Sequence, residues 1–195
     1  MSRFAPWVIA VDGLDGTGKS TIVRLLAEAL NAPAMSSPPA SLRGERSVAD
    51  TLPEAERRAW YMRANGMAMA EARAQAGREL VVMDRSITST LAFGLAERGR
   101  VASSADFPPG ADLPEFRFLL RCEESVRVQR IRLRGESRTR EEWRLETDHD
   151  FRERVLAGFS NICTHKIDSS ATPDAICGLL AGIVSTALVS ERRTG

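Results

Sequence analysis

The chain has 195 residues and a formal net charge of +1, so its length favours one domain with a substantial core. A charge so close to balance argues against a dedicated nucleic-acid surface. No early stretch has the apolar core of a signal peptide, and no run approaches the roughly 20 apolar residues of a membrane span. Cys122, Cys163 and Cys177 form no close pair, so we expect a reduced, cytoplasmic protein, with a disulfide or a zinc site as the alternative.

A phosphate-binding loop is the clearest motif, because residues 13–20 have the spacing of a glycine, four residues, a second glycine, a lysine and a serine. Residues 7–11 before it are apolar and predict a buried strand. The helical repeat over residues 22–30 predicts a helix after it. Unpaired amides at such a helix start bind phosphate, whereas a simple glycine turn capping a helix is the alternative. The residues predicted to bind the nucleotide here are Gly13, Asp15, Gly16, Thr17, Gly18, Lys19, Ser20 and Thr21.

Two side chains of this loop have predicted chemical roles. Lys19 would reach the β- and γ-phosphates as a compact charge. Only Lys19 and Lys166 are lysines among 27 basic residues, which favours a specific need for lysine at this place. Ser20 would be a ligand of Mg²⁺ through its hydroxyl group.

Residues 31–35 predict a turn that leads into a short strand, and the proline- and serine-rich stretch 36–41 predicts a loop. That loop is either one wall of an acceptor pocket or a solvated connection. Residues 54–76 predict one long helix that Gly77 stops. Its apolar residues are expected to pack in the core, with a pocket lining as the alternative; they are Ala59, Trp60, Tyr61, Met62, Met67, Met69 and Ala70.

Residues 79–83 predict a second buried strand, with Asp84 and Arg85 at its end and a helix after it. In open parallel sheets, ligands lie beyond the carboxyl ends of the strands. We therefore expect Asp84 and Arg85 beside the phosphate loop, with Asp84 acting on Mg²⁺ indirectly, through groups bound to the ion, or as a weak base. The alternative is an aspartate cap with a surface arginine.

The second half of the chain predicts a strand over 116–121, a helix over 125–133, a strand over 164–167 and a last helix from Thr172. An arginine-rich segment at about 134–146 is either a mobile lid or a solvated face balanced by glutamates. Residues 148–150 are expected inside a helical stretch ending near Gly158, where adjacent side chains point apart and disfavour a metal site. Strands alternate with helices throughout, which predicts an α/β class with a parallel sheet.

Taken together, these motifs resemble the thymidylate kinase branch of the nucleoside monophosphate kinases. Residues 11–21 are similar to that family's phosphate loop, including the acid within it. Residues 84–93 are similar to its signature of Asp-Arg-Tyr, two residues, Ser, two residues and Ala-Tyr, with Ser86 and Phe93 at the places of the two tyrosines. Residues 166–173 are similar to the strand and loop beside the adenine, so the resemblance covers nearly the whole chain.

The resemblance implies a three-layer P-loop NTPase fold, with about five parallel strands, helices on both faces and one domain over residues 1–195. It also implies an ATP- and Mg²⁺-dependent kinase of a small phosphorylated acceptor, with a homodimer as one possible assembly. Asp15 would contact the acceptor sugar or its phosphate region, and Arg85 would clamp the acceptor phosphate. The other implied contacts are Ser89 and Met62 with the acceptor, and Ser170 and Ala171 with the nucleotide.

The catalytic arginine would come from the lid, because Gly16 leaves no arginine inside the phosphate loop. Its candidates are Arg134, Arg138 and Arg140.

The departures from the family pattern fall on the acceptor side. Residues 36–39 read Ser-Ser-Pro-Pro where the family has Arg-Glu-Pro-Gly-Gly. Met62 and Gly66 stand where the family has a stacking phenylalanine and, four residues on, a base-contacting arginine. We therefore expect dTMP to be a poor acceptor. The alternative acceptors are another nucleotide, a nucleoside or a specialised metabolite. A nucleoside is among them because Asp-Arg-Ser also resembles the Glu-Arg-Ser of deoxynucleoside kinases. A non-catalytic nucleotide-binding role is a further alternative.

Overall fold

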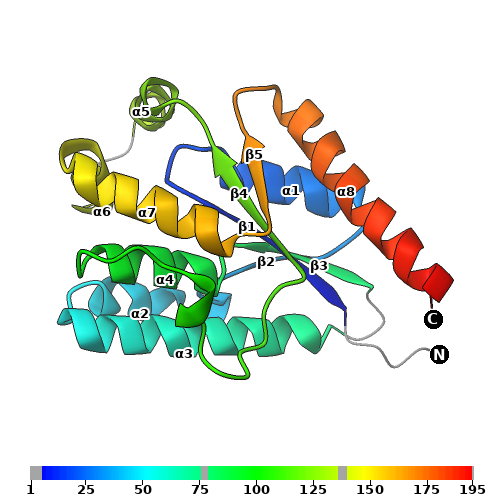
Figure 1. Ribbon diagram of the computed structural model, residues 1–195, viewed down its shortest axis with the longest axis horizontal. Helices are drawn as coiled ribbons and strands as arrows, with labels where there is room; N and C mark the ends of the chain where they lie inside the picture. The colour runs from blue at the N-terminus through cyan, green and yellow to red at the C-terminus, as the bar shows by residue number, and fades with distance from the viewer. Residues whose placement is uncertain (1–5, 76–78, 136–139, 195) are drawn as a thin grey trace.

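The computed structural model describes residues 6–75, 79–135 and 140–194, and its centre is a five-stranded parallel sheet (Figure 1). The strand order is β2-β3-β1-β4-β5, which places β1 in the middle between β3 and β4. The strands are β1 (Trp7–Gly13), β2 (Ala34–Ser36), β3 (Leu80–Asp84), β4 (Phe116–Arg121) and β5 (His165–Asp168). This arrangement confirms the predicted α/β class with a parallel sheet of about five strands and helices on both faces.

One face of the sheet is covered by α1 (Lys19–Ala29) and α8 (Pro173–Thr194). Ile9 and Val11 of β1 and Phe118 of β4 point to this face and are fully buried. Leu26 of α1 and Leu180 of α8 pack against them, also with no exposed area. Burial of side chains of this size typically stabilises the fold by about 1.5–3 kcal/mol each, which fixes α1 directly behind the phosphate loop.

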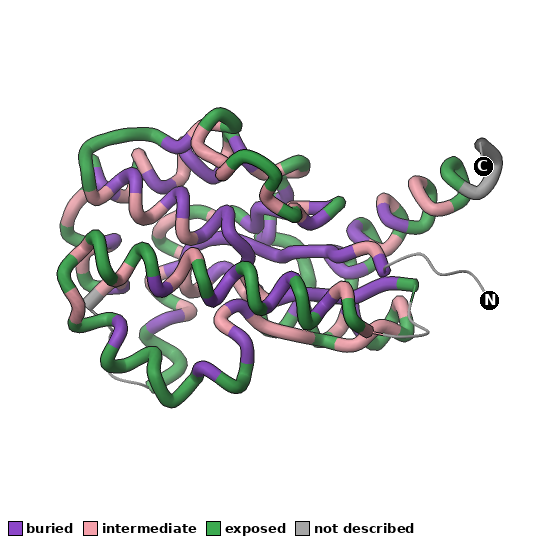
Figure 2. Tube along the Cα trace, turned by 90° about the horizontal axis from the view of Figure 1, so that it is seen from below, coloured by how far each residue is buried: buried purple, intermediate pink, exposed green. Residues whose placement is uncertain are grey.

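The opposite face is covered by α3 (Glu54–Arg73), α4 (Ile87–Ala96) and α7 (His149–Ile162). Phe151 and Phe159 of α7 pack with Ala92 of α4 over Leu119 of β4. Figure 2 shows the buried positions running along the strands and along the inward faces of these helices. The remaining helices are α2 (Arg43–Ala49), α5 (Glu124–Leu133), α6 (Arg140–Thr147) and two short 3-10 turns, Ala40–Leu42 and Ser104–Asp106.

Three predictions about the helices are wrong in detail, and α2 lies at residues 43–49, for which no element was predicted. The predicted apolar side of α3 is only partly right, because Trp60 and Met69 are buried whereas Ala59, Met67 and Ala70 are exposed. The buried residues of that helix are Trp60, Ala64, Asn65, Ala68, Met69 and Ala72.

α3 ends at Arg73, before the predicted stop at Gly77, which lies outside the described residues. The charged stretch predicted to end near Gly158 is divided into α6 and α7, and α7 continues to Ile162. Asp148 causes the division, since its carboxylate accepts a hydrogen bond from the Phe151 amide as the N-cap of α7.

The last helix is more apolar than expected. Contrary to the expectation from the sequence, an 18-residue window within Pro173–Glu191 has a mean hydropathy of 1.6, so this helix is long and apolar enough to cross a membrane by length and composition, a test that the core helix of a soluble protein also passes. One side of this helix packs in the core through Ile176, Cys177, Leu180 and Val184, as expected of a helix that covers a sheet. The three cysteines are free thiols.

Candidate active site

The phosphate loop follows β1 and closes on the start of α1. Gly16 and Gly18 have φ angles of 88° and 92°, in the left-handed region that side chains with a Cβ rarely adopt. At Gly13, a Cβ would lie 2.6 Å from the Leu120 carbonyl oxygen of β4, so this glycine lets two strands approach and lies behind the cavity rather than in its lining. The shape of the loop therefore depends on glycine at these three positions, where a side chain would be strained or would collide with β4.

Lys19 and Asp15 form a charged pair inside this loop. The Lys19 Nζ donates to the Leu14 carbonyl oxygen at 2.9 Å and to Asp15 Oδ1 at 3.3 Å. Burial and the neighbouring Arg85 lower the pKa of Lys19, although Asp15 partly opposes them. Burial alone would raise the pKa of Asp15, but the positive charges of Arg85 and Lys19 hold it well below its usual range. Asp15 is therefore an anion between two cations.

Arg85 is positioned by a strained turn at the end of β3. Its φ angle is 70°, which is uncommon for a residue other than glycine. Asp12, which is fully buried, accepts hydrogen bonds from Ser86 Oγ at 2.8 Å and Ser89 Oγ at 2.7 Å and so fixes the turn. The Arg85 guanidinium then forms an ion pair with Asp15 and donates to Ser89 Oγ at 3.3 Å. The sequence analysis missed the part played by Asp12.

Ser20 and Asp84, the two predicted Mg²⁺ groups, lie side by side. The Ser20 hydroxyl donates to Asp84 Oδ2 at 2.9 Å, and both residues line the cavity over the phosphate loop. A hydroxyl and a carboxylate are hard oxygen donors, which is the ligand type that Mg²⁺ prefers. No cluster of three His, Cys, Asp or Glu residues that could hold a metal occurs among the described residues.

α5 packs directly on the phosphate loop. Arg127, only 1% exposed, donates to the Asp15 carbonyl oxygen at 3.0 Å and is held by Glu124 at 2.6 and 2.7 Å. A Cβ on Gly16 would meet the Arg127 carbonyl oxygen at 2.7 Å and Ile131 at 2.9 Å. This contact leaves no room for an arginine at position 16 and makes Arg127 part of the loop's support.

The residues expected near the nucleotide base are partly brought together. Ala171 lines the cavity over the phosphate loop, as do Ser169 and Arg130, whereas Ser170 is exposed and does not line it. Arg130 donates to the Ser169 carbonyl oxygen at 3.0 Å and thereby ties α5 to the loop between β5 and α8. Thr17 and Thr21 also line this cavity.

Two cavities meet at the phosphate loop. The donor cavity, of about 650 Å³, lies over the loop, and the acceptor cavity, of about 330 Å³, lies between α3, α4 and α6. Both sizes lie in the usual range of small-molecule sites. The residues that line both cavities, and so form their shared wall, are Asp15, Ser37, Pro38, Arg46 and Arg85. Ser37 and Pro38 thus lie at a pocket wall, one of the two expectations for their loop.

The acceptor cavity has lining residues on α3 beyond the main expectation, because a pocket was only the alternative for Tyr61 and Asn65 had no predicted role. Tyr61 and Asn65 of α3 line it, whereas Met62 does not line it and packs beside Ile87, Leu91 and Leu95. Met62 was expected to contact the acceptor, but its neighbour Tyr61 lines this cavity instead. Asn65 is fixed there, because it accepts from Ser37 Oγ at 2.5 Å and donates to Thr90 Oγ1 at 2.8 Å. Ser89 lines the same cavity, as predicted.

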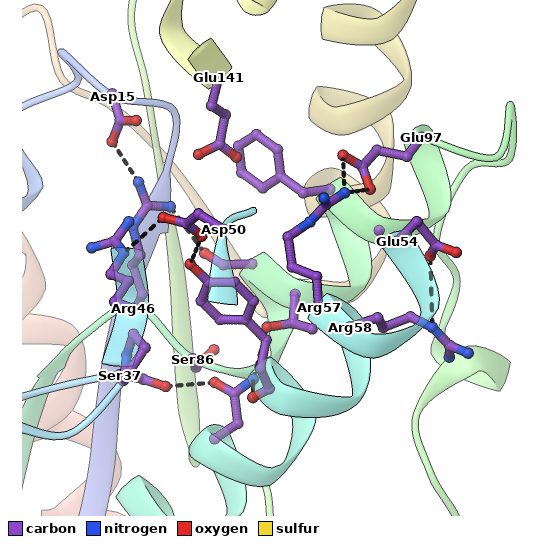
Figure 3. A pocket seen from close by; sticks show the side chains of 18 of the residues that line it. Asp15, Ser37, Arg46, Asp50, Glu54, Arg57, Arg58, Ser86, Glu97 and Glu141 are labelled. Carbon is purple, nitrogen blue, oxygen red and sulfur yellow. Dashed lines mark hydrogen bonds and ion pairs between the residues drawn. The ribbon is translucent and has the colours of Figure 1, made fainter. Parts of the chain in front are cut away.

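Of the three candidate catalytic arginines of the lid, only Arg134 has a side chain within the described part of the chain. Arg134 lines the donor cavity and forms an ion pair with Glu142. Arg138 lies outside the described residues, and the side chain of Arg140 is also outside them. Glu141, at the start of α6, lines the acceptor cavity and points into it (Figure 3). Burial raises the pKa of Glu141 to about 7, against the opposing effect of Arg85.

Comparison with known proteins agrees with this geometry. The Thymidylate kinase family model matches residues 11–176. The thymidylate kinase of Cereibacter sphaeroides is 31% identical over 212 residues, which cover 93% of this chain and 97% of that protein. The human mitochondrial UMP-CMP kinase 2 is 28% identical over 91% of this chain, and the chain spans 42% of its length.

The fold also has solved counterparts. A thymidylate kinase structure from Candida albicans superposes with a TM-score of 0.68 at 18% identity, covering 94% of this chain and 92% of that one. At that identity the likeness concerns the fold alone. The family match and the bacterial relative carry the assignment further, to phosphoryl transfer from ATP. The chain belongs to the thymidylate kinase family of ATP-dependent phosphotransferases.

Proposed function

We propose that the protein transfers the γ-phosphoryl group of ATP to the phosphate of a nucleoside monophosphate. The observation that carries this proposal is the wall shared by the two cavities, which contains the guanidinium groups of Arg46 and Arg85. Two guanidinium groups suit the oxygens of a phosphate, with which they can form charge-assisted hydrogen bonds. Arg85 already pairs with Asp15, and Arg46 Nε lies 3.8 Å from Asp50 Oδ2. An acceptor phosphate would add a second anion beside both cations, which a neutral hydroxyl would not.

The donor side would work through the phosphate loop. Amides near Gly16 and Gly18 would receive phosphate oxygens, and Lys19 would exchange its contact with the Leu14 carbonyl oxygen for the transferred phosphoryl group. A buried cation acts strongly there, because water does not screen it. Ser20 and Asp84 would hold Mg²⁺, which when bound would neutralise charge on the phosphates.

The reaction joins an oxygen of the acceptor phosphate to the γ-phosphorus, while the bond from that phosphorus to the bridging oxygen of ADP breaks. Such transfers need positioning and charge stabilisation more than a strong base. Arg46 and Arg85 would orient the attacking oxygen, and Asp15 would hold Arg85 in place through its ion pair. Arg134 faces the donor cavity and is a candidate for stabilising the transferred group, whereas Arg138 and Arg140 stay predictions from the sequence.

Paired acceptors test the proposal directly. ADP release would be measured with each nucleoside beside its own 5′-monophosphate, so that only the phosphate differs within a pair. We expect kcat/KM to be at least about 1,000-fold higher for a monophosphate, since loss of a buried charge partner costs several kcal/mol. A nucleoside used as well as its monophosphate would instead favour a nucleoside kinase. ATP binding with no acceptor consumed would favour a nucleotide-binding module.

A further inference from the structure

Two consecutive carbonyl oxygens of the phosphate loop are each held by a cation. The Leu14 carbonyl oxygen accepts a hydrogen bond from Lys19 Nζ at 2.9 Å, and Lys19 lines the donor cavity. The Asp15 carbonyl oxygen accepts from Arg127 at 3.0 Å, and Arg127 lines neither the donor nor the acceptor cavity. One cation therefore holds the loop from the cavity side, and the other holds it from behind.

ATP would affect these two contacts differently. Lys19 would leave the Leu14 carbonyl oxygen when it turns to the transferred phosphoryl group, as in the proposed function. Arg127 lies behind the loop with 1% of its surface exposed, so a phosphate in the donor cavity does not reach it. Its contact with the Asp15 carbonyl oxygen is the one that persists when ATP binds.

Glu124 keeps the Arg127 guanidinium in its orientation. The two carboxylate oxygens of Glu124 accept hydrogen bonds from Arg127 Nε at 2.7 Å and Nη2 at 2.6 Å, which leaves Nη1 for the Asp15 carbonyl oxygen. A guanidinium is a planar fork, so two bonds to one carboxylate fix the direction of the remaining N–H groups. The carboxylate also provides the anion that a buried cation needs, because an unpaired charge in the interior is costly.

The peptide between Asp15 and Gly16 connects Arg127 to the donor cavity. A trans peptide is planar, with its carbonyl oxygen and its amide hydrogen on opposite sides. The Asp15 carbonyl oxygen points to Arg127 behind the loop, so the Gly16 amide points the other way, and Gly16 lines the donor cavity. Glycine adopts either sign of φ easily, so without a fixed partner this peptide would turn over at little cost.

We propose that Arg127 is a positioning residue that locks the Asp15–Gly16 peptide with its amide toward the phosphates of ATP. Glu124 serves the same lock by orienting Arg127. This inference rests on the donor side of the proposed function, in which amides of the loop bind phosphate. The charge of Arg127 also polarises the peptide, so the Gly16 N–H becomes a stronger donor to an anion. Both Arg127 and Glu124 act through the loop and not by touching ATP.

The experiment follows the Gly16 amide by NMR in protein labelled with isotope-enriched glycine, before and after addition of Mg·ADP, which binds without turnover. An amide that donates to a phosphate oxygen shifts downfield, so the wild-type Gly16 signal should shift. Arg127→Met keeps the length of the side chain without its donors. In this variant the Gly16 shift should fall by more than half, and the Kd for ADP should rise about tenfold. The Gly18 amide is the reference in the same spectrum and should keep its shift.

A second variant acts on the same lock from its exposed side. Glu124→Ala removes the carboxylate that orients Arg127, so the same amide shift should fall and the Kd for ADP should rise. Arg152, which lies 3.5 Å from Glu124, keeps its hydrogen bond to the Leu145 carbonyl oxygen at 2.9 Å, so α7 stays anchored. Glu123→Ala is the matched control, because Glu123 is an exposed neighbour, and it should change neither value.

Two results would overturn this inference alone. One is a wild-type Gly16 amide that does not shift with Mg·ADP although the Gly18 amide does. The other is a Gly16 shift that is equal in the wild-type protein and Arg127→Met, which would mean that Arg127 only joins α5 to the loop. If Arg127→Met does not fold, Glu124→Ala decides, since an unchanged Gly16 shift there would equally contradict the lock. A wild-type protein that does not bind Mg·ADP at all would instead end the proposed function.

Discussion

The donor and acceptor cavities are built in different ways. The largest single part of the donor cavity is one continuous stretch, residues 15–22 of the phosphate loop and the start of α1, where backbone geometry and one lysine supply the binding groups. The acceptor cavity takes single residues at helical spacing from α2, α3, α4, α6 and α7. A local backbone device tolerates little change, whereas a wall assembled from separate helices can exchange its residues one at a time. This contrast agrees with a family-like donor side beside a divergent acceptor side.

The largest expected effect is on the donor side. Lys19→Ala should lower kcat by about 100-fold or more, because it deletes a buried charge at the transferred phosphoryl group. Lys166→Ala removes the other lysine, which is exposed on β5, and should leave kcat unchanged. The measurement is the initial rate with saturating ATP and acceptor. Near-normal turnover of a folded Lys19→Ala protein would contradict the assignment of the donor cavity.

Two neighbouring arginines sharpen the comparison at the lid. Arg134 lines the donor cavity and pairs with Glu142, whereas Arg132 is 65% exposed and lies near Glu146. Arg134→Ala should lower kcat by at least about tenfold with a smaller change in the KM for ATP, since its charge acts mainly in the transition state. Arg132→Ala should change neither value. Equal effects of the two substitutions would indicate that the arginine-rich segment is a solvated face and not a lid.

A smaller effect is expected on the acceptor side of α3. Asn65→Ala removes two hydrogen bonds that fix the cavity wall, so the KM for the acceptor should rise roughly tenfold while the KM for ATP changes little. Gly66→Ala adds a methyl group where no atom lies within 4 Å, and should leave both values unchanged. If Gly66→Ala raised the acceptor KM and Asn65→Ala did not, the acceptor would lie against Met62 and Gly66, as first expected from the sequence.

The smallest effect concerns pH and Glu141. The pKa of this carboxyl is raised to about 7, so the fold favours its protonated form. The associated stabilisation is present at low pH and is lost as pH rises through the folded value of about 7. The melting temperature of the wild-type protein should therefore fall, relative to Glu141→Gln, between about pH 5 and pH 8. If the melting temperatures of the two proteins changed in parallel with pH across this range, the pKa of Glu141 would not be raised.

The sequence predicted the donor side well because its signals are local. A strand, a glycine turn and a helix start follow one another within residues 7–30, and the structure has these elements at those places. Asp84 and Arg85 were predictable too, because parallel strands end at one edge of the sheet. Arg85 and Asp15 accordingly meet in an ion pair.

The acceptor side was less predictable for two physical reasons. α3 has polar and apolar residues all around it, so its inward face could not be read from periodicity, and the assignment missed Tyr61 and Asn65 by one residue. Arg46, Glu97 and Glu141 are far apart in sequence and follow no motif, so only the packing of helices brings them to one cavity. Tyr61 and Arg57 place a ring and a guanidinium in this cavity at positions other than those of the family pattern, and the expectation that dTMP is a poor acceptor stays a prediction.

Affinity for a bisubstrate analogue tests most directly whether the two cavities form one continuous site for phosphoryl transfer. The ligand is adenosine joined through an oligophosphate to the nucleoside of the best monophosphate acceptor, and its Kd would be measured beside that of ATP. We expect binding at least about 100-fold tighter than that of ATP, because the shared wall at Asp15, Arg46 and Arg85 lets both ends bind at once. An analogue that binds no tighter than ATP would contradict a site in which donor and acceptor phosphates meet at this wall.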